Sequence, residues 1–596
     1  MSSANLIHIA RQLAADLTWL EGYAGERAEL QSAVVPLRLS AALLRNQVAP
    51  YLEKRPSQPL YVAVVGGAGT GKSTLVNFLI GRSAAETNPQ AGFTRHPVAF
   101  VAVGSPFIEQ LNDGILGPLK SIPGPCPSDR DEDVFQIRQV ALISEGENEP
   151  LRQAVIWDCP DMTTWKANRY QTRLVETIGL ADLILYVASD ERYNDAWPTQ
   201  YLQYILQAGK PVVACLTKMQ PSQVEPMLKH FRESVIARIP ECAGVSATVA
   251  LPSLSAAEQA DPAGVGAPIR KGLLEPVNWW LKQPQKTRHD SVLRAARFLE
   301  QFQQTLLAPA RHDLAAVTMW ESWVHSGRHT FVHRYQNEYL TGESFPHFNA
   351  AMLRLMELLE LPGVGQYVSK AMHLLRSPYR WVKSWFNKPN SKDMPEAQVL
   401  QAGFQGWLDH LRQQVLQQDE QHPVWKALRS AFHDQRDRQL HEQFQARITE
   451  FMQQQALSTE TTARAIYQEL EKNPTALNTL RGIKFSIEAA SLTGVVITAG
   501  THLFLDALLI PLVASLTQGL TEAMGKTYVD TQREKARTSQ LKLFEEKLAM
   551  PLAHELNQWP GSLIPNLPKL RDIVDRLPKD LAALKSAVES TSMEGT

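Results

Sequence analysis

Residues 66–73 read GGAGTGKS and decide the fold, because they match the pattern G-x-x-x-x-G-K-[ST]. The apolar run LYVAVV at 60–65 comes directly before them, and a helical pattern begins at Lys72. A glycine-rich turn between a strand and a helix lets backbone N–H groups surround phosphate oxygens at the positive end of the helix dipole. The stretch therefore predicts a phosphate-binding loop, which we call the P-loop.

The P-loop predicts contacts to a nucleoside triphosphate and to Mg²⁺. We expect Lys72 to reach the β- and γ-phosphates, Ser73 to be a ligand of Mg²⁺, and Thr70 to offer a hydroxyl near the reacting phosphate. Lys72 and Thr70 are therefore candidate catalytic residues. The expected nucleotide contacts of this loop are Gly66, Gly67, Ala68, Gly69, Thr70, Gly71, Lys72, Ser73 and Thr74.

Two further segments offer candidate groups for the metal and the phosphates. Asp158 ends the run LRQAVIWD at 151–158, and a P-loop needs an acidic residue at the end of a neighbouring strand to hold the metal shell. Asp161 follows it closely and is a candidate nucleotide contact. The polar segment 83–97 is of a kind that becomes ordered when nucleotide binds. We expect its Thr94 to be a second metal ligand and a catalytic residue, with Thr87 as the competing position.

Short apolar runs alternate with helical stretches from residue 57 to 280, which predicts a mainly parallel sheet covered on both faces. Residues 1–56 show the period of an amphipathic helix, whereas 281–596 are rich in helix formers and lack strand patterns. The sequence thus predicts an N-terminal helical segment, an α/β P-loop nucleoside triphosphatase domain and a large all-α region. The expected strands are 60–65, 97–103, 134–143, 151–158, 182–189, 211–217 and 248–254.

The strand expected at 211–217 runs into Thr217-Lys218-Met219-Gln220, which resembles the [NT]-K-x-D motif of the translation-factor class of P-loop GTPases. The resemblance implies a Ras-like sheet and a guanine nucleotide bound by Thr217 and Lys218. Gln220 replaces the carboxylate that pairs with guanine, which keeps an ATPase open as an alternative. Ser255-Ala256 resembles the last, base-lining motif of these GTPases, and Ser246-Ala247 is a rival match.

The order of these motifs, the segment GFTRHP at 92–97 and the large helical region resemble dynamin-like bacterial large GTPases. The resemblance implies Mg²⁺-dependent GTP hydrolysis that drives a conformational switch of the helical region, in a homo-oligomer at a membrane surface. The alternative is a soluble regulatory switch that acts on a protein partner. Asp161 stands where such GTPases commonly have glycine, and Met162 stands where Ras-like relatives position the attacking water with glutamine. The candidates to replace that glutamine are Thr70, Arg95, Arg169 and Arg173.

Charge and cysteine content restrict the partners and the compartment. Lys and Arg number 60 and Asp and Glu 61, a balance unlike that of basic nucleic-acid-binding chains, so we expect no nucleic-acid partner. The four scattered cysteines form no disulfide framework, and the first thirty residues lack an uninterrupted apolar signal segment. We expect a cytoplasmic protein that associates with the inner membrane peripherally or by insertion.

Two segments of the helical region are candidates for contact with membrane lipid. Residues 361–392 combine Lys and Arg with Trp, Tyr and Phe and contain no acidic residue before position 393, which suits an interfacial helix. Residues 485–522 include the long apolar run 489–520, interrupted only by His502 and Asp506 among ionisable types. For each segment the alternative is a helix pair packed inside a helical bundle.

Overall fold

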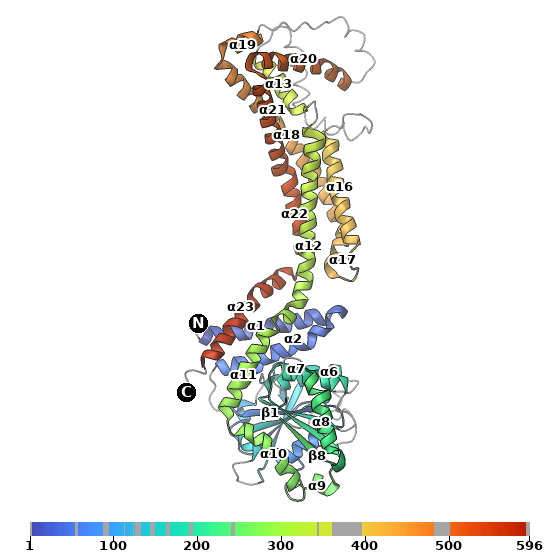
Figure 1. The fold of residues 1–596 in the computed structure, drawn as a ribbon, viewed down its shortest axis with the longest axis vertical. Coiled ribbons are helices and arrows are strands. Elements are labelled where there is room, and N and C mark those ends of the chain that lie inside the picture. Colours follow the sequence, from blue (N-terminus) through green and yellow to red (C-terminus); the bar gives the residue numbers. More distant parts are fainter. Residues whose placement is uncertain are drawn as a thin grey trace. The chain divides into compact units, whose positions relative to one another are not determined.

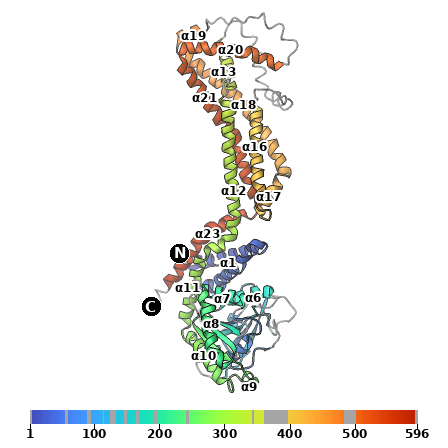
Figure 2. The same cartoon turned by 45° about the vertical axis from the view of Figure 1, so that its right-hand side comes forward.

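The fold is that of a computed structural model, and the chain forms two compact units, residues 1–312 with 569–596, and residues 313–568 (Figures 1 and 2). The residue at which the predicted domain 57–280 ends lies in helix α10 (Ala267–Leu281), and its bounds stay a prediction. The structure describes residues 3–53, 58–87, 94–111, 114–122, 124, 133–143, 149–162, 167–189, 195–239, 245–341, 345–359, 396–481 and 501–591.

The first unit contains an eight-stranded sheet in the order β3-β4-β2-β5-β1-β6-β7-β8. All neighbouring strands are parallel except β2 and β5, which run antiparallel. The prediction of a mainly parallel sheet is therefore confirmed. The strands are β1 (Leu60–Gly66), β2 (Val98–Ala102), β3 (Lys120–Ile122), β4 (Val134–Val140), β5 (Ala154–Asp158), β6 (Leu183–Ser189), β7 (Val212–Met219) and β8 (Ala247–Pro252).

The seven predicted strands are all present, with two local differences. Residues 151–153, predicted as the start of a strand, belong to the short helix α5 (Pro150–Gln153), which begins at a proline in the first turn of a helix. The short edge strand β3 was not predicted, because three residues are too few to show an alternating pattern.

Helices cover both faces of the sheet, which explains why β1 is buried along its whole length. On one face, α4 (Lys72–Ile80) and α10 pack against alternate residues of β1 and β6, including Val62, Val64 and Leu185. On the other face, α6 (Ala167–Leu180) contacts β1, and helix α2 (Gln31–Leu43) packs on α6. The remaining helices between the strands and α10 are α7 (Ala196–Gln207), α8 (Val224–Ser234) and α9 (Ala256–Ala260).

Helices from both ends of the chain complete the first unit. Asp16 of α1 (Ser3–Gly25) forms an ion pair with Arg576 of α23 (Leu567–Thr591), with 2.5 Å between Oδ2 and Nη2. Lys585 of α23 binds Glu300 of α11 (Pro284–Gln301) at 2.7 Å. The predicted N-terminal helical segment is thus three helices, α1, α2 and α3 (Ala49–Leu52), joined by the short turns η1 (Ala28–Leu30) and η2 (Leu44–Val48).

The second unit is helical throughout its described residues. Its interior is built around aromatic side chains such as Phe331, Tyr335 and Phe544, whose rings lie 4.1 to 5.0 Å apart by centroid where they contact. Its helices are the part of α12 (Gln303–Tyr335) from residue 313 onward, then α13 (Pro346–Leu358), α16 (Glu396–Leu416), α17 (Pro423–Ala431), α18 (Gln435–Glu471), α19 (Pro474–Arg481), α20 (Thr501–Met524), α21 (Lys526–Phe544) and α22 (Met550–Leu563).

The two candidate lipid-contacting segments fall mostly outside the described residues. Residues 361–392 lie there completely, as do 485–500 of the segment 485–522, and the side chains of 501–512 are not described either. Among the helices in the described ranges, none combines the length and the apolar character needed to cross a bilayer.

Candidate functional site

The P-loop joins the end of β1 to the start of α4. Gly69 and Gly71 have φ angles of +70° and +93°, a left-handed backbone that glycine adopts without the steric cost of a side chain. Gly66 is required for a different reason, because a Cβ there would lie 2.2 Å from the carbonyl oxygen of Val187 in β6. The glycines therefore allow the loop to turn tightly at the start of α4, where the positive end of a helix dipole suits a phosphate.

Lys72, the first residue of α4, points back into the loop. Its Nζ donates a hydrogen bond to the carbonyl oxygen of Gly67 at 2.9 Å and a second one to the carboxylate of Asp161. The Thr70 hydroxyl also donates to the Gly67 carbonyl at 2.9 Å, so it is used inside the loop. The structure thus brings together three of the predicted site residues, Lys72, Thr70 and Asp161.

Ser73 and Asp158 form the pair expected to hold a metal. The Ser73 hydroxyl donates to Asp158 Oδ2 at 2.7 Å, while the other carboxylate oxygen, Oδ1, is buried and has no hydrogen-bond partner among the described residues. Burial raises the pKa of Asp158 to about 6, although the Ser73 hydrogen bond and the charge of Lys72 act against it. A hydroxyl and a carboxylate with an oxygen unused are donors that suit Mg²⁺, so the residues present fit this ion.

The segment that carries Thr94 is fixed at its two described ends. Asn77 of α4 donates to the Ala85 carbonyl at 2.9 Å and accepts from the N–H groups of Ala84 and Ala85. Arg138 of β4 binds the Ala84 carbonyl and the Glu86 carboxylate. Neither residue was predicted to belong to the site, although Asn77 is a polar residue inside the otherwise apolar helical stretch LVNFLI at 75–80.

Thr94 opens the next described stretch and is half-buried, whereas Thr87 is exposed. Arg173, a candidate cationic substitute for the missing glutamine, is 1% exposed and binds both Asp133 and the backbone carbonyl of Arg95 at 3.1 Å. Its guanidinium is therefore committed to holding residues 94–97 rather than available to a substrate. The side chain of Arg169 lies outside the described residues.

The predicted base-binding residues lie at the carboxyl ends of β7 and β8. The Thr217 hydroxyl donates to the Thr70 carbonyl at 2.7 Å, which ties β7 directly to the P-loop. Lys218 follows, exposed and with φ of +62°, the single positive φ outside glycine in the described chain. A side chain held in this conformation costs about 1–2 kcal/mol. Observed strain of this kind is concentrated at functional sites.

The two rival serine-alanine matches lie at opposite ends of the strand β8. Ser255 follows β8 at the edge that carries Lys218, whereas Ser246 precedes β8 and its N–H bonds the carbonyl of Val212 at the start of β7. Ser255 is the N-cap of α9 and forms a capping box with Glu258, and Ala256 is the first residue of that helix. Ser255-Ala256 is thus the match that follows the carboxyl end of a parallel strand, as the P-loop does.

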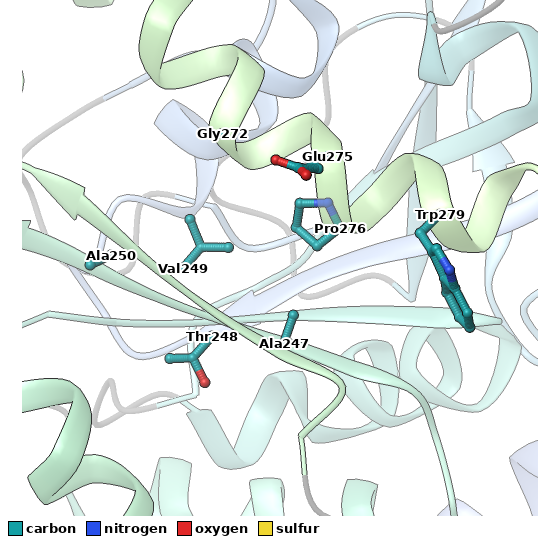
Figure 3. A pocket seen from close by; sticks show the side chains of 8 residues that line it. All are labelled: Ala247, Thr248, Val249, Ala250, Gly272, Glu275, Pro276 and Trp279. Atoms are coloured by element: carbon teal, nitrogen blue, oxygen red, sulfur yellow. The ribbon is translucent and has the colours of Figure 1, made fainter.

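A pocket of about 550 Å³ lies elsewhere in the same domain, between the edge strand β8 and α10 (Figure 3). Its lining includes Ala247, Val249 and Pro276, with Glu275 as the one charged side chain and Trp279 exposed at one side. Apart from Ala247 of the rival Ser246-Ala247 match, it contains none of the predicted nucleotide or metal contacts. This lining offers no cation for a phosphate.

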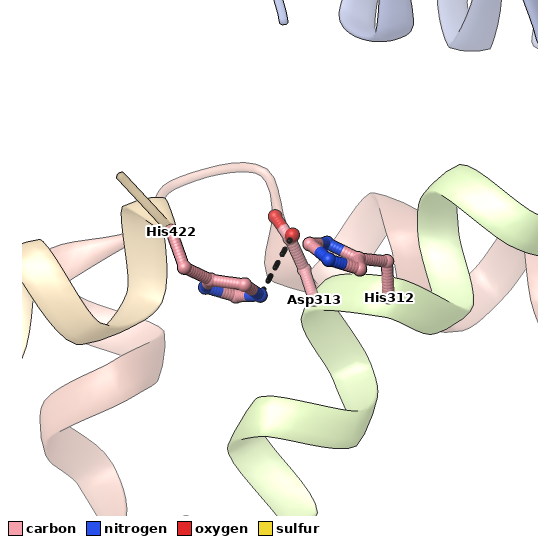
Figure 4. A group of neighbouring side chains, drawn as sticks. All are labelled: His312, Asp313 and His422. Carbon is pink, nitrogen blue, oxygen red and sulfur yellow. Dashed lines mark ion pairs between the residues drawn. The ribbon is translucent and has the colours of Figure 1, made fainter. Parts of the chain in front are cut away.

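In the second unit, Asp313 of α12 faces His422 (Figure 4). His422 Nδ1 accepts a hydrogen bond from the Val424 N–H and so caps α17, which leaves the proton of a neutral ring on Nε2. Nε2 lies 3.7 Å from Oδ1 of the fully buried Asp313. The His422 ring thus lies beside a buried carboxylate and also caps α17.

Comparison with known proteins identifies the domain that contains the P-loop. Residues 61–218 match the family described as "50S ribosome-binding GTPase". GTPase Der of Cereibacter sphaeroides is 36% identical over 96 residues, which cover 16% of this chain and 18% of that protein. GTPase Der of a Bradyrhizobium species is 49% identical over 47 residues, or 8% of this chain and 10% of the relative. The chain therefore spans less than a fifth of the length of these relatives.

Two solved structures are similar at low identity. Era in complex with MgGDPNP and nucleotides 1506–1542 of 16S ribosomal RNA is 20% identical, with a TM-score of 0.22, and the match covers 36% of this chain and 57% of Era. A structure described as an oligomerised bacterial dynamin pair, a mechanism for long-range sensing and tethering of membranes, is 11% identical, with a TM-score of 0.33 and coverage of 92% and 94%.

These findings correct one expectation from the sequence. The balanced charge led us to exclude a nucleic-acid partner, but the family that matches residues 61–218 is described as ribosome-binding. That exclusion was wrong, because net charge averages over the whole chain and says nothing about one domain of it.

Proposed function

We propose that this chain, in which residues 61–218 form a P-loop GTPase domain, binds GTP with Mg²⁺ and hydrolyses it to GDP and phosphate. The observation that carries the proposal is the convergence of Lys72, Ser73 and Asp158 at the mouth of the P-loop, with Thr217 and Lys218 at the adjoining strand end. Lys218 and the translation-factor resemblance favour GTP. Gln220, which is exposed after β7, keeps ATP as the alternative substrate.

Ser73 and Asp158, with Thr94 as a further ligand, would hold Mg²⁺, which when bound would offset the negative charge that develops on the phosphates. The P-loop N–H groups and Lys72 would bind the phosphates and fix their orientation. Met162 is buried and its N–H bonds the Gly66 carbonyl at 3.2 Å, and its thioether cannot orient a water. We therefore infer a slow intrinsic reaction that another group must complete.

The contacts of α6 support coupling between the nucleotide and the N-terminal helices. Glu176 of α6 is buried and binds Arg45 at 2.6 Å and Asn46 at 2.7 Å, both in the turn η2 that follows α2. Gly179 packs so closely on Ala42 that a Cβ there would lie 2.6 Å from the Ala42 side chain. Because α6 is the first helix after Asp158 and Asp161, a movement of these two residues would also displace α6 and thereby change its contacts with α2.

We further propose that this switch acts in a homo-oligomer at a membrane surface. The support is the basic and aromatic composition of 361–392 and the apolar run at 489–520. The competing functions are a soluble switch that acts on a protein partner, or a ribosome-associated GTPase, which the family description favours.

The test is steady-state phosphate release from GTP and from ATP by the purified full chain. Lys72→Ala is the blank, and Lys229→Ala, an exposed lysine of α8, is the matched control that should turn over GTP like the natural protein. Release from GTP that disappears only in Lys72→Ala supports the proposal, whereas equal release from both variants overturns it. Faster phosphate release with anionic liposomes supports the membrane role. Faster release with ribosomes but not with liposomes overturns the membrane role in favour of a ribosome-associated GTPase.

A further inference from the structure

The P-loop lysine already has an anionic partner inside the protein. Lys72 Nζ is hydrogen-bonded to Asp161, and the two side chains are 4% and 8% exposed. Its other bond is to the Gly67 carbonyl, within the loop itself. A carboxylate is therefore already bound to the ammonium group that would otherwise bind the β- and γ-phosphates of a nucleoside triphosphate.

The backbone on both sides of Asp161 is fastened to β1 and the P-loop. The Cys159 N–H donates to the Val64 carbonyl at 3.3 Å, and the Met162 N–H donates to the Gly66 carbonyl at 3.2 Å. The contact between Asp161 and Lys72 is thus part of a three-bond clasp between residues 159–162 and 64–72. A movement of this segment away from the P-loop has to break the clasp.

We propose that Asp161 is a specificity-determining residue: it serves as the counter-ion of Lys72 when a diphosphate or no nucleotide is bound, and it must be expelled before a triphosphate binds. The proposal rests on the proposed function and deepens it. A third phosphate brings one more anionic group toward the same buried ammonium, and like charges that share such a site repel each other strongly. Asp161 therefore lowers the affinity for GTP relative to GDP.

The same repulsion gives the direction of the switch. Where glycine stands at this position, a backbone N–H can approach the γ-phosphate. Here a carboxylate is pushed away from it, so residues 159–162 would leave the P-loop instead of closing on it. Because α6 follows this segment and packs on α2, binding of the triphosphate would loosen α6 and not tighten it.

The test must also distinguish the opposite role for Asp161, in which its carboxylate turns toward Ser73 and Asp158 and helps to hold Mg²⁺. The two roles predict opposite effects when the charge is removed. Without its charge, a counter-ion no longer competes and GTP binds more tightly. Without its charge, a metal ligand is lost and GTP binds more weakly.

The experiment measures the dissociation constants of GDP and of the non-hydrolysable analogue GppNHp by titration calorimetry, in Mg²⁺ at fixed ionic strength. The variants are Asp161→Asn, which keeps the size and removes the charge, and Asp161→Gly, which removes the side chain. Asp182→Asn is the matched control. It removes another buried carboxylate of this domain, one that binds Tyr61 N and Arg288 at the opposite edge of the sheet.

We expect both Asp161 variants to raise the affinity for GppNHp relative to GDP by about tenfold or more, and Asp182→Asn to leave that ratio unchanged. Faster amide exchange in α6 with GppNHp than with GDP, abolished in Asp161→Asn, would support the stated direction of the switch. An unchanged ratio, or a selective loss of GppNHp binding, overturns the inference while GDP binding keeps the proposed function intact. Absence of binding of either nucleotide to the natural protein overturns both.

Discussion

At the scale of single residues, Lys218 carries a cost that a substitution can reveal. Its φ of +62° is unfavourable for any residue with a Cβ, so Lys218→Gly should be more stable than Lys218→Ala by about 1 kcal/mol. The measurement is the thermal transition that GDP shifts, because that transition belongs to the domain that binds the nucleotide.

Lys229 provides the matched comparison for Lys218. It is an exposed lysine inside α8, where glycine is expected to be less stable than alanine by about 1 kcal/mol. The two positions should therefore rank alanine and glycine in opposite orders. The same order at both positions would mean that the backbone at Lys218 is not strained.

Lys210 should make the stability of the protein depend on pH. It is buried, and desolvation lowers its pKa from 10.5 to about 7, although three oxygens, from Gln47, Gly179 and Ala181, accept hydrogen bonds from it and Asp182 favours its charge. Between these two pKa values the unfolded chain carries the proton and the folded chain does not. Stability should then rise with pH by up to about 1.4 kcal/mol per unit, with no slope from this group below about pH 7.

The measurement is the melting temperature of the natural protein and of Lys210→Met from pH 7 to pH 9. The difference between them should move in favour of the natural protein as the pH rises, on top of a constant loss caused by the hydrogen bonds that Met cannot make. Lys229→Met is the control with an exposed lysine. Parallel curves for Lys210→Met and the natural protein would show that Lys210 is charged in the fold.

These residues also show what a sequence reveals about a site and what it does not. The P-loop is a local pattern in which glycines, lysine and serine are adjacent, so it could be predicted without knowing the fold. Lys210 could not, because its partner Gln47 is 163 residues away and nothing in the neighbourhood of either residue indicates the other. Asn77 lies between these cases, since its partners are only 7 and 8 residues ahead and its polarity within an apolar helix was visible.

At the scale of elements, the contact between α2 and α6 depends on the missing side chain of Gly179. A Cβ at this position would lie 2.6 Å from Cβ and 3.0 Å from the carbonyl carbon of Ala42. Gly179→Ala should therefore destabilise the docking of α2 by about 1–3 kcal/mol and speed amide exchange in that helix. Mass spectrometry of the exchanging protein checks the location of the effect.

Gly22 of α1 is the control, because a Cβ there meets nothing within 4 Å. Gly22→Ala should stabilise its helix by about 0.5–1 kcal/mol, since alanine has less backbone entropy to lose than glycine. Opposite signs from the same chemical change would isolate the close packing as the cause. Equal signs would contradict the role of Gly179 at this contact.

The elements themselves were largely predictable, and the exceptions have physical reasons. Strands such as β1 and β6 are buried on both faces, so they read as continuous apolar runs. The strand β3 is partly exposed and three residues long, and α5 replaces the beginning of a predicted strand because Pro150 favours a helical first turn. Length and burial, more than composition, separate the correct predictions from the others.

At the scale of the whole molecule, the division into a sheet domain and a helical region follows from periodicity, but the make-up of the first unit does not. Its helix α23 comes from the end of the chain, and Arg576 binds Asp16 across 560 residues of sequence. Each of the helices α1 and α23 has an apolar face, but nothing in the local sequence of either helix indicates which other helix packs against that face. Long-range pairing of this kind became visible only in the structure.

The whole molecule should hydrolyse GTP faster per chain as its concentration rises. The reason is that two of the positions considered for orienting the water are unsuited to it: Met162 is buried and apolar, and Arg173 is bound to Asp133 and to the backbone of Arg95. A second copy that supplies the missing group would accelerate the reaction by orders of magnitude in the manner of an arginine finger. The measurement is phosphate release at saturating GTP over a wide range of protein concentration, with sedimentation velocity on the same samples.

An inactive chain separates this explanation from a change in nucleotide binding. Lys72→Ala loses its own turnover but keeps the surface of the protein, so adding it in excess to a small amount of the natural protein should raise the rate of the latter. If the missing group instead comes from a lipid surface, the added chain has no effect and liposomes raise the rate at every protein concentration. If the rate per chain is the same at every protein concentration and with or without the inactive chain or liposomes, the water-positioning group is already present in each molecule. Thr70, whose hydroxyl lies on the P-loop, would then be the next residue to replace.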